Sequence, residues 1–260
     1  MRPQDVARAV GEAGGIDVVI NAAAYTAVDK AEAEEAVAQQ INSETVGVLA
    51  EACARRDLPL IHVSTDYVFD GNKTTPYIES DATNPLNAYG RSKLGGERAI
   101  HSSGVRHVIL RTSWIYSAFG ANFVKTMLRL GVERDELRVV DDQYGAPTAA
   151  GDLAAAIFCI AHSIVHARAD AMFGTYHYTG GGVTTWHDFA ATIMADAKWA
   201  GVRASVVPIS TDEYPLPARR PKNSRLDCAK ITRTFGITPV PLRAALEDVL
   251  GEIRRERGLV

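Results

Sequence analysis

Apolar and polar positions follow two different periodicities along the first half of the chain. Apolar runs with little alternation, typical of strands covered on both faces, lie at residues 17–20, 58–63 and 105–110. Helical patterns lie at residues 6–13, 31–56 and 87–101. Strands separated by helices of this length pair in parallel through right-handed crossovers. The first half therefore predicts an α/β fold with a doubly wound, mostly parallel sheet.

The pattern becomes looser beyond about residue 140. Strands are predicted at residues 137–140 and 175–178, and helices at residues 151–165, at 186–199 and from about Leu242. Six of the eleven prolines interrupt the stretch after Val206. Such loop-rich material commonly covers the carboxyl ends of the strands, where ligands bind in open α/β folds. We expect residues 1–145 to form the sheet domain and residues 146–260 mainly a smaller lobe, with some segments returning to the first domain.

Composition narrows the classes of protein that need to be considered. The chain of 260 residues is 47% hydrophobic and 23% charged, which is enough to build a core. Its net charge is −3 and it has no block of five like charges, so nucleic-acid binding is not expected. The longest apolar run, residues 153–161, is too short to cross a bilayer, and the opening residues lack a signal-peptide pattern. Three distant cysteines indicate neither a disulfide framework nor a zinc site. We therefore expect a cytoplasmic protein.

The strongest chemical pattern is Tyr89-Gly-Arg-Ser-Lys93. On a helix this spacing places the phenol and the ammonium on one face, and Asn87 is a suitable capping residue just before them. A nearby lysine favours the ionised phenol, whose ordinary pKa is about 10, and so makes the tyrosine a better proton donor. The spacing alone is equally compatible with an exposed helix pair.

A strand end upstream supplies the context for this pair. The predicted strand ends at Ser64-Thr65-Asp66, one crossover before Tyr89. A hydroxyl at a strand end followed by Tyr-x-x-x-Lys provides the three groups that a carbonyl reductase requires. Thr65 would hold the substrate oxygen, Tyr89 would donate the proton, and Lys93 would tune Tyr89.

Several ordered stretches carry a family resemblance. They are residues 21–32 (NAAAYTAVDKAE), 64–71 (STDYVFDG), 87–94 (NAYGRSKL), 111–116 (RTSWIY), 142–148 (DQYGAPT) and 220–224 (RPKNS). Together they resemble the dTDP-4-dehydrorhamnose reductase family of the extended short-chain dehydrogenase/reductase superfamily. The resemblance implies a Rossmann-type, dinucleotide-binding first domain and a C-terminal substrate-binding lobe. It implies reduction of the 4-keto group of the nucleotide sugar dTDP-4-dehydro-L-rhamnose to dTDP-L-rhamnose by NADPH or NADH.

The resemblance also implies roles for individual residues. Tyr89 corresponds to the proton donor, Lys93 to its partner that also holds the nicotinamide ribose, and Thr65 to the hydroxyl beside the carbonyl. The implied cofactor contacts also include Ala22, Ala23, Ala24 and Val63. Asp66 corresponds to a substrate contact.

Two further substrate contacts are expected with explicit alternatives. Trp114 matches the sugar-binding aromatic of the family, and a core tryptophan is the alternative. Arg220 and Arg219 lie in the proline-rich segment. Arg220 is suited to clamp a diphosphate and Arg219 less so, with exposed surface charge as the alternative.

His162 and His166 have a metal-compatible spacing without an acidic or cysteine ligand nearby, so no metal site is predicted. The resemblance leaves room for Mg²⁺ at a subunit contact, without assignable ligands, and for a homodimer.

One departure from the family pattern concerns the cofactor. Dinucleotide folds have a glycine-rich turn after their first strand, and none is found here. The run Gly180–Gly182 lacks the last glycine of the Gly-x-Gly-x-x-Gly pattern, because position 185 is threonine. We interpret it as a packing turn before a helix that Thr184 or Thr185 caps. The family pattern places a strand, the glycine turn, a helix and a second strand, roughly forty residues, before Met1. We expect a polypeptide without them to be poorly stable and to bind cofactor weakly.

Two alternative functions remain open at this point. The first is reduction of another nucleotide 4-ketosugar. The second is a non-catalytic regulatory or binding subunit on the same fold, which the missing glycine turn favours and the intact Thr65, Tyr89 and Lys93 disfavour. The preference for NADPH or NADH is undetermined. The residue that contacts the ribose follows the second strand of the family pattern, which is one of the missing elements.

Overall fold

A parallel sheet forms the centre of the computed structural model, which describes residues 3–167, 172–256 and 258. Its strands are β1 (Val19–Asn21), β2 (Leu60–Thr65), β3 (His107–Thr112) and β8 (Gly174–His177). They pair in the order β1-β2-β3-β8, all parallel. The predicted doubly wound, Rossmann-type architecture is therefore confirmed. The outermost residues of both predicted domains, 1–2 and 259–260, lie outside the described residues.

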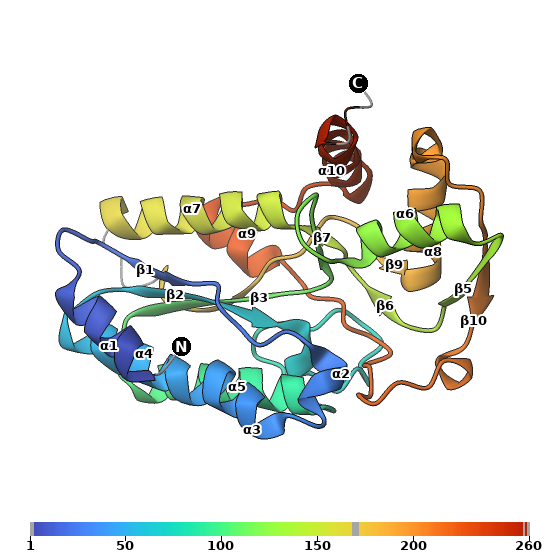
Figure 1. Cartoon of the computed structure of the whole chain (residues 1–260). Coiled ribbons are helices and arrows are strands. Elements are labelled where there is room, and N and C mark those ends of the chain that lie inside the picture. Colours follow the sequence, from blue (N-terminus) through green and yellow to red (C-terminus); the bar gives the residue numbers. More distant parts are fainter. Residues whose placement is uncertain (1–2, 168–171, 257, 259–260) are drawn as a thin grey trace.

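Helices cover both faces of this sheet (Figure 1). On one face lie α1 (Pro3–Glu12), α4 (Thr45–Arg55) and α5 (Ala88–Ser102), and on the other α7 (Ala150–Ala167) and α9 (Ala229–Phe235). Leu60 and Ile109 pack into the core under α4 and α5, whereas Ile61 and Val108 pack against α7. Because neighbouring strand residues enter different cores, both must be apolar, which explains the runs without alternation.

A second hydrophobic core lies beyond the carboxyl ends of the strands. It is built by α6 (Phe123–Glu133), β5 (Glu136–Val140), α8 (Trp186–Asp196), β10 (Ser205–Ile209) and α10 (Leu242–Glu256). β5 and β10 pair in parallel. Although α6 and β5 precede residue 145 they pack here, whereas α7 and β8, which follow it, return to the large sheet. The domain division itself stays a prediction.

Shorter elements connect the two cores. Two small ladders pair β4 (Ile115–Tyr116) with β7 (Thr148–Ala149), and β6 (Tyr144–Gly145) with β9 (Thr184–Thr185). Single 3₁₀ turns lie at η2 (Asp66–Val68), η4 (Lys198–Ala200) and η5 (Thr211–Glu213). Thr185 caps α8 by accepting a hydrogen bond from the Asp188 N–H. A Cβ at Gly180 would lie 2.1 Å from the Pro147 carbonyl oxygen, which supports the packing role expected of the triple-glycine turn.

The helical prediction for residues 31–56 is confirmed over most of the segment, with a break at residues 32–34 and a π-helical turn within it. The segment forms α2 (Val28–Ala31), α3 (Glu35–Gln39), the π-helical turn η1 (Gln40–Glu44) and then α4. Asn42 in the wide turn is fully buried; its side chain accepts a hydrogen bond from the Tyr25 N–H (2.8 Å) and donates one to the Ser92 hydroxyl (2.9 Å). Contacts with segments distant in sequence therefore accompany the interruption, and helical periodicity gave no sign of them.

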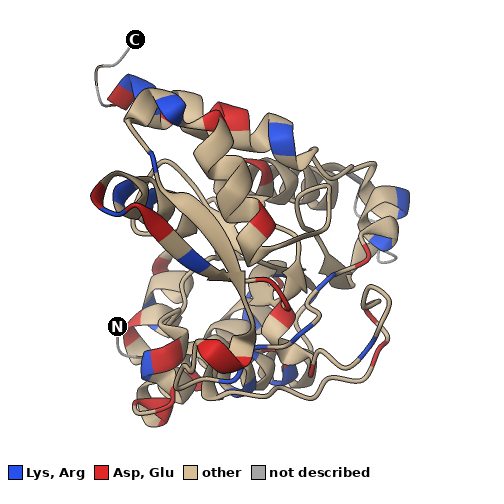
Figure 2. Cartoon of the chain, turned by 90° about the vertical axis from the view of Figure 1, so that its right-hand side faces the viewer, with Lys and Arg blue, Asp and Glu red and all other residues tan. Residues whose placement is uncertain are grey.

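Acidic and basic residues are interspersed on the face of the molecule shown in Figure 2, as expected from the small net charge. None of the described helices combines the length and the hydropathy that a membrane span requires.

Candidate active site

Two of the predicted site residues lie where β2 ends. Thr65 has extended backbone, and its hydroxyl donates a hydrogen bond to the Asp66 carboxylate (2.9 Å) and accepts one from the Tyr67 N–H (3.2 Å). Asp66 is only 3% exposed, and its Oδ2 has no hydrogen-bond partner among the described residues. Burial raises the pKa of this carboxyl group to about 7, despite the hydrogen bond from Thr65. The strand end thus presents a hydroxyl beside a carboxyl that titrates near neutral pH.

Helix α5 brings Tyr89 and Lys93 to this strand end. Asn87 caps the helix as predicted, because its side chain accepts a hydrogen bond from the Gly90 N–H (2.8 Å). A Cβ at Gly90 would lie 2.2 Å from the Tyr67 carbonyl oxygen, so glycine permits the close approach of helix and strand end. Lys93 is buried, and its Nζ donates a hydrogen bond to the Val63 carbonyl oxygen (2.7 Å).

Burial has the largest effect on the electrostatics of the pair. Tyr89 is half-buried, and its removal from water is the main reason that its pKa is raised to about 12; a hydrogen bond with the Thr65 side chain opposes this rise and the Asp66 charge adds to it. Burial also lowers the pKa of Lys93 to about 8, an effect that the Glu97 charge opposes. The ammonium of Lys93 is directed to the Val63 carbonyl, and burial outweighs the other influences on the pKa of Tyr89; that Lys93 stabilises the ionised phenol stays a prediction. Near neutral pH Tyr89 carries its proton and Lys93 is mostly charged.

Two side chains that sequence reasoning missed extend this site toward β1. His62 is fully buried, with Nε2 at 3.4 Å from Lys93 Nζ and Nδ1 at 3.0 Å from the Asn21 side-chain nitrogen. Burial and the charge of Lys93 hold the pKa of His62 well below its usual range, so the ring is neutral. Asn21 also accepts a hydrogen bond from the Ala23 N–H (3.1 Å), which shapes the turn after β1. A histidine within an otherwise apolar strand was the available signal.

The residues expected to contact the nicotinamide end of a cofactor lie side by side. β1 and β2 are neighbours, with Asn21 opposite His62. Ala22 and Ala23 are exposed and Ala24 is half-buried, so small side chains leave the backbone of this turn open to a flat ligand. That these residues, with Val63 and Lys93, contact a nicotinamide ribose stays a prediction. A glycine-rich turn, Gly180–Gly182, follows β8 of the large sheet, but it packs against the Pro147 carbonyl, so no pyrophosphate site is assigned to it.

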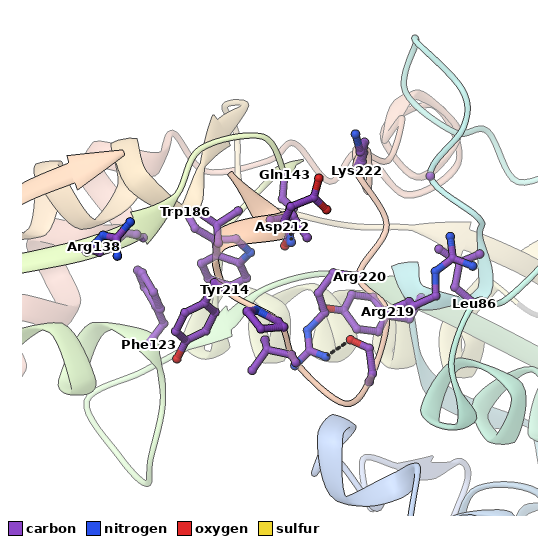
Figure 3. Close-up of a pocket in the computed structure, with 18 of the residues that line it drawn as sticks. Leu86, Phe123, Arg138, Gln143, Trp186, Asp212, Tyr214, Arg219, Arg220 and Lys222 are labelled. Atoms are coloured by element: carbon purple, nitrogen blue, oxygen red, sulfur yellow. Dashed lines mark hydrogen bonds between the residues drawn. The ribbon is translucent and has the colours of Figure 1, made fainter. Parts of the chain in front are cut away.

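A cavity of about 800 Å³ lies next to this site. Figure 3 shows Phe123 and Trp186 toward one end of it and Leu86 and Arg219 toward the other, with Arg220 between. Tyr67 lines the cavity and packs edge-to-face against Tyr89, with ring centroids 5.9 Å apart. The cavity is therefore lined by aromatic and basic side chains, and Tyr67 connects it to Tyr89.

Trp114 is positioned by two unusual backbone features. Its φ of 49° lies in the left-handed region, and a Cβ at Gly145 would lie 2.4 Å from its ring. The ring stacks on Trp186 with centroids 3.6 Å apart and planes at 9°. Trp186, which the sequence analysis did not select, lines the cavity. Stacking therefore connects Trp114 to the cavity, and direct sugar contact by Trp114 stays a prediction.

Arg220 lines the cavity but is already paired. Its Nη1 and Nη2 donate to the two oxygens of Asp29 at 2.8 and 2.7 Å, and these hydrogen bonds lower the pKa of Asp29. Arg219 is exposed, and no hydrogen bond or ion pair to its guanidinium is formed within the described part of the chain. A diphosphate contact by Arg220 stays a prediction, and Arg219 is the freer of the two cations.

Comparison with known proteins agrees with this arrangement. The family model "RmlD substrate binding domain" matches residues 1–255. A dTDP-4-dehydrorhamnose reductase of Shigella flexneri is 47% identical over 241 residues, which cover 91% of this chain and 80% of the relative. The crystal structure of a dTDP-4-dehydrorhamnose reductase from Clostridium acetobutylicum superposes with a TM-score of 0.86 and 38% identity, covering 96% of this chain and 85% of that one. The crystal structure of the Bacillus anthracis dTDP-4-dehydrorhamnose reductase in complex with NADP superposes with a TM-score of 0.85 and 36% identity, covering 98% of this chain and 85% of that one. The chain therefore belongs to the dTDP-4-dehydrorhamnose reductase family.

Proposed function

We propose that this chain is an oxidoreductase of dTDP-L-rhamnose biosynthesis that reduces the 4-keto group of dTDP-4-dehydro-L-rhamnose with NADPH or NADH. The observation that carries the proposal is the juxtaposition of Thr65, Tyr89 and Lys93 at the carboxyl end of β2, beside a cavity lined by aromatic and basic side chains. Membership of the family supports the nucleotide sugar as substrate.

The proposed chemistry follows from the positions of these three groups. When the substrate binds, the Thr65 hydroxyl turns its proton from Asp66 to the ketone oxygen, to which the Tyr89 hydroxyl also donates. The nicotinamide, when bound, supplies the hydride to the carbonyl carbon. Tyr89 gives its proton to the oxygen as negative charge develops there, and the Lys93 ammonium stabilises the phenolate that remains. Because the pKa of Tyr89 is about 12, the proton is present before the reaction begins.

Binding is assigned to residues around this centre. We infer that Lys93 holds the nicotinamide ribose together with the turn and strand residues Ala22, Ala23, Ala24 and Val63. Asp66 and the Trp114–Trp186 stack serve the sugar. Arg219 serves the diphosphate, and so does Arg220 through the donors that Asp29 and the Ala218 carbonyl leave free.

Replacing Tyr89 by phenylalanine tests the proton donor. The Tyr89→Phe variant should lose turnover by on the order of 10²- to 10⁴-fold while its affinity for NADPH stays unchanged, because only the transferred proton is removed. Turnover is measured by NADPH consumption and by identifying the sugar product by NMR. Tyr176→Phe is the matched control, because Tyr176 is a buried tyrosine on β8 whose hydroxyl bonds the Met172 carbonyl. Near-normal turnover of Tyr89→Phe would remove Tyr89 as the acid.

The same assay separates the substrate from its alternatives. Turnover of dTDP-4-dehydro-L-rhamnose well above that of the UDP-linked or other 4-ketosugars is the expected result, whereas the reverse order would identify another nucleotide-sugar reductase. Absence of turnover with any 4-ketosugar would favour a non-catalytic subunit. A cytoplasmic location and a homodimer belong to this proposal, and no ligands are assigned to a magnesium ion.

A further inference from the structure

A second group of buried polar side chains joins β2, β3 and α5 beside the site. The Ser64 hydroxyl donates to Glu97 Oε1 at 2.5 Å. Arg111 donates from Nε to the same oxygen at 2.9 Å and from Nη2 to Glu97 Oε2 at 2.6 Å. The side chains of Arg111 and Glu97 are 6% and 2% exposed, so the ion pair is shielded from water.

Each member of this group is adjacent to a residue of the proposed mechanism. Ser64 directly precedes Thr65, and Glu97 follows Lys93 by one turn of α5. Arg111 lies opposite Ser64 in the parallel register of β2 and β3. Since Lys93 also bonds the Val63 carbonyl, α5 is held to two consecutive residues of β2 immediately before Thr65.

Stability alone does not account for a charged group at this place. Removing two charges from water is costly, and buried ion pairs are often replaceable by apolar residues of similar volume without loss of stability. The pair also leaves Arg111 Nη1 without a hydrogen-bond partner among the described residues, with the guanidinium 5.1 Å from the centre of the Phe69 ring. What the charged hydrogen bonds provide, and apolar contacts do not, is a fixed direction and distance between helix and strand.

We propose that Ser64, Glu97 and Arg111 are positioning residues that set how far Tyr89 and Lys93 on α5 stand from a ketone held at Thr65. The inference rests on the proposed function and adds a role for residues that touch neither substrate nor cofactor. A displacement of about 1 Å in a reacting group reduces turnover by as much as 10²-fold, so a small shift of α5 has a large effect.

Two variants test this role. Ser64→Ala removes one hydrogen bond and leaves the ion pair in place. Glu97→Leu combined with Arg111→Leu replaces the whole pair by apolar side chains. We expect kcat to fall about fivefold or more in the first and at least about 30-fold in the second, with the KM for the nucleotide sugar and the Kd for NADPH within about twofold of the parent.

An exposed ion pair on the same helix supplies the control. Arg91 on α5 makes a bidentate contact with Glu35, at 2.9 and 3.1 Å, and both side chains are more than 40% exposed. Glu35→Gln weakens this pair and should leave kcat unchanged. If kcat of Glu35→Gln fell as much as kcat of Ser64→Ala, the proposal would be overturned, because any weakening of the attachment of α5 would then have the same effect.

Crystal structures of the variants give a result that does not depend on turnover. We expect the distance from Lys93 Nζ to the Val63 carbonyl oxygen to lengthen in Ser64→Ala, and an unchanged position of α5 with unchanged kcat would overturn the proposal. If the double variant does not fold, Ser64→Ala decides alone. If the parent protein reduces no 4-ketosugar, the proposed function fails, and the position of α5 in the variant structures still supports or refutes the positioning role.

Discussion

The buried carboxyl group of Asp66 predicts a specific dependence of stability on pH. Its pKa of about 7 in the folded protein compares with an ordinary value of 3.8. Below about pH 4 the group is protonated in both the folded and the unfolded chain, so it does not affect the balance. As the pH rises toward 7 the unfolded chain loses this proton while the folded chain retains it. Stability therefore falls over this interval and levels off above about pH 7.

The size of the effect follows from the shift. Each pKa unit corresponds to about 1.4 kcal/mol, so the full shift amounts to roughly 4 kcal/mol. Between about pH 5 and about pH 8 the expected part is roughly 2.5 kcal/mol. Asp66→Asn removes the titration and retains an oxygen that can accept the hydrogen bond from Thr65. The stability of the variant relative to the parent should therefore rise by that amount between the two pH values.

Urea unfolding of the parent and of Asp66→Asn at both pH values measures this difference. The contributions of the other titrating groups to the pH dependence of the unfolding free energy largely cancel, because the parent and the variant share these groups. Asp135→Asn is the control, since the Asp135 side chain is 91% exposed and should produce almost no pH-dependent difference. A constant difference between the parent and Asp66→Asn at both pH values would refute the reasoning, because it would mean that Asp66 is solvated or paired in the folded protein.

Three further predictions concern activity. Because burial lowers the pKa of Lys93 to about 8, kcat/KM of the parent should fall as the pH rises above 8. An active Lys93→Arg variant should not show this fall. A parent pH profile that stays flat above pH 8 would contradict the role of the Lys93 charge. Gly145→Ala should displace the Trp114 ring and raise the KM for the nucleotide sugar about tenfold at unchanged NADPH affinity by fluorescence titration; an unchanged KM would separate Trp114 from sugar binding. Arg219→Leu should raise the same KM about tenfold, because a charged contact to the diphosphate is lost, and isothermal titration with dTDP tests this contact directly.

Local signals in the sequence were sufficient for the elements that carry the chemistry. The capping bond from the Gly90 N–H to Asn87 spans three residues, so the start of α5 was predictable from its own sequence. The apolar runs identified β2 and β3 because both faces of the sheet are covered. The strand-end hydroxyl of Thr65 and the Tyr89–Lys93 pair then followed from the order of these elements.

Contacts between distant segments account for what the sequence did not predict. Asn42, in the wide turn that interrupts the long helix, bonds residues 17 and 50 positions away. Arg220 is paired with Asp29 across 191 positions, so the sequence could suggest its charge but not that the charge is already balanced. The pKa of Tyr89 depends on burial by several segments at once, which the spacing of Tyr89 and Lys93 alone cannot reveal.

Buried charge provides a further argument for locating function at this end of the sheet. Among the described residues the buried Asp, Glu, Lys and Arg side chains are Asp66, Lys93, Glu97 and Arg111. All four lie on β3 and α5 or in the turn that follows β2, near the carboxyl ends of the strands. Burial of charge opposes folding unless the groups are paired, and departures from an apolar core are expected where a site requires fixed polar geometry. The sequence already contained part of this signal, because Arg111 ends an otherwise apolar run in β3 and His62 interrupts one in β2. A polar residue inside a buried parallel strand is thus a reason to search its neighbours for catalytic groups, even where no motif includes it.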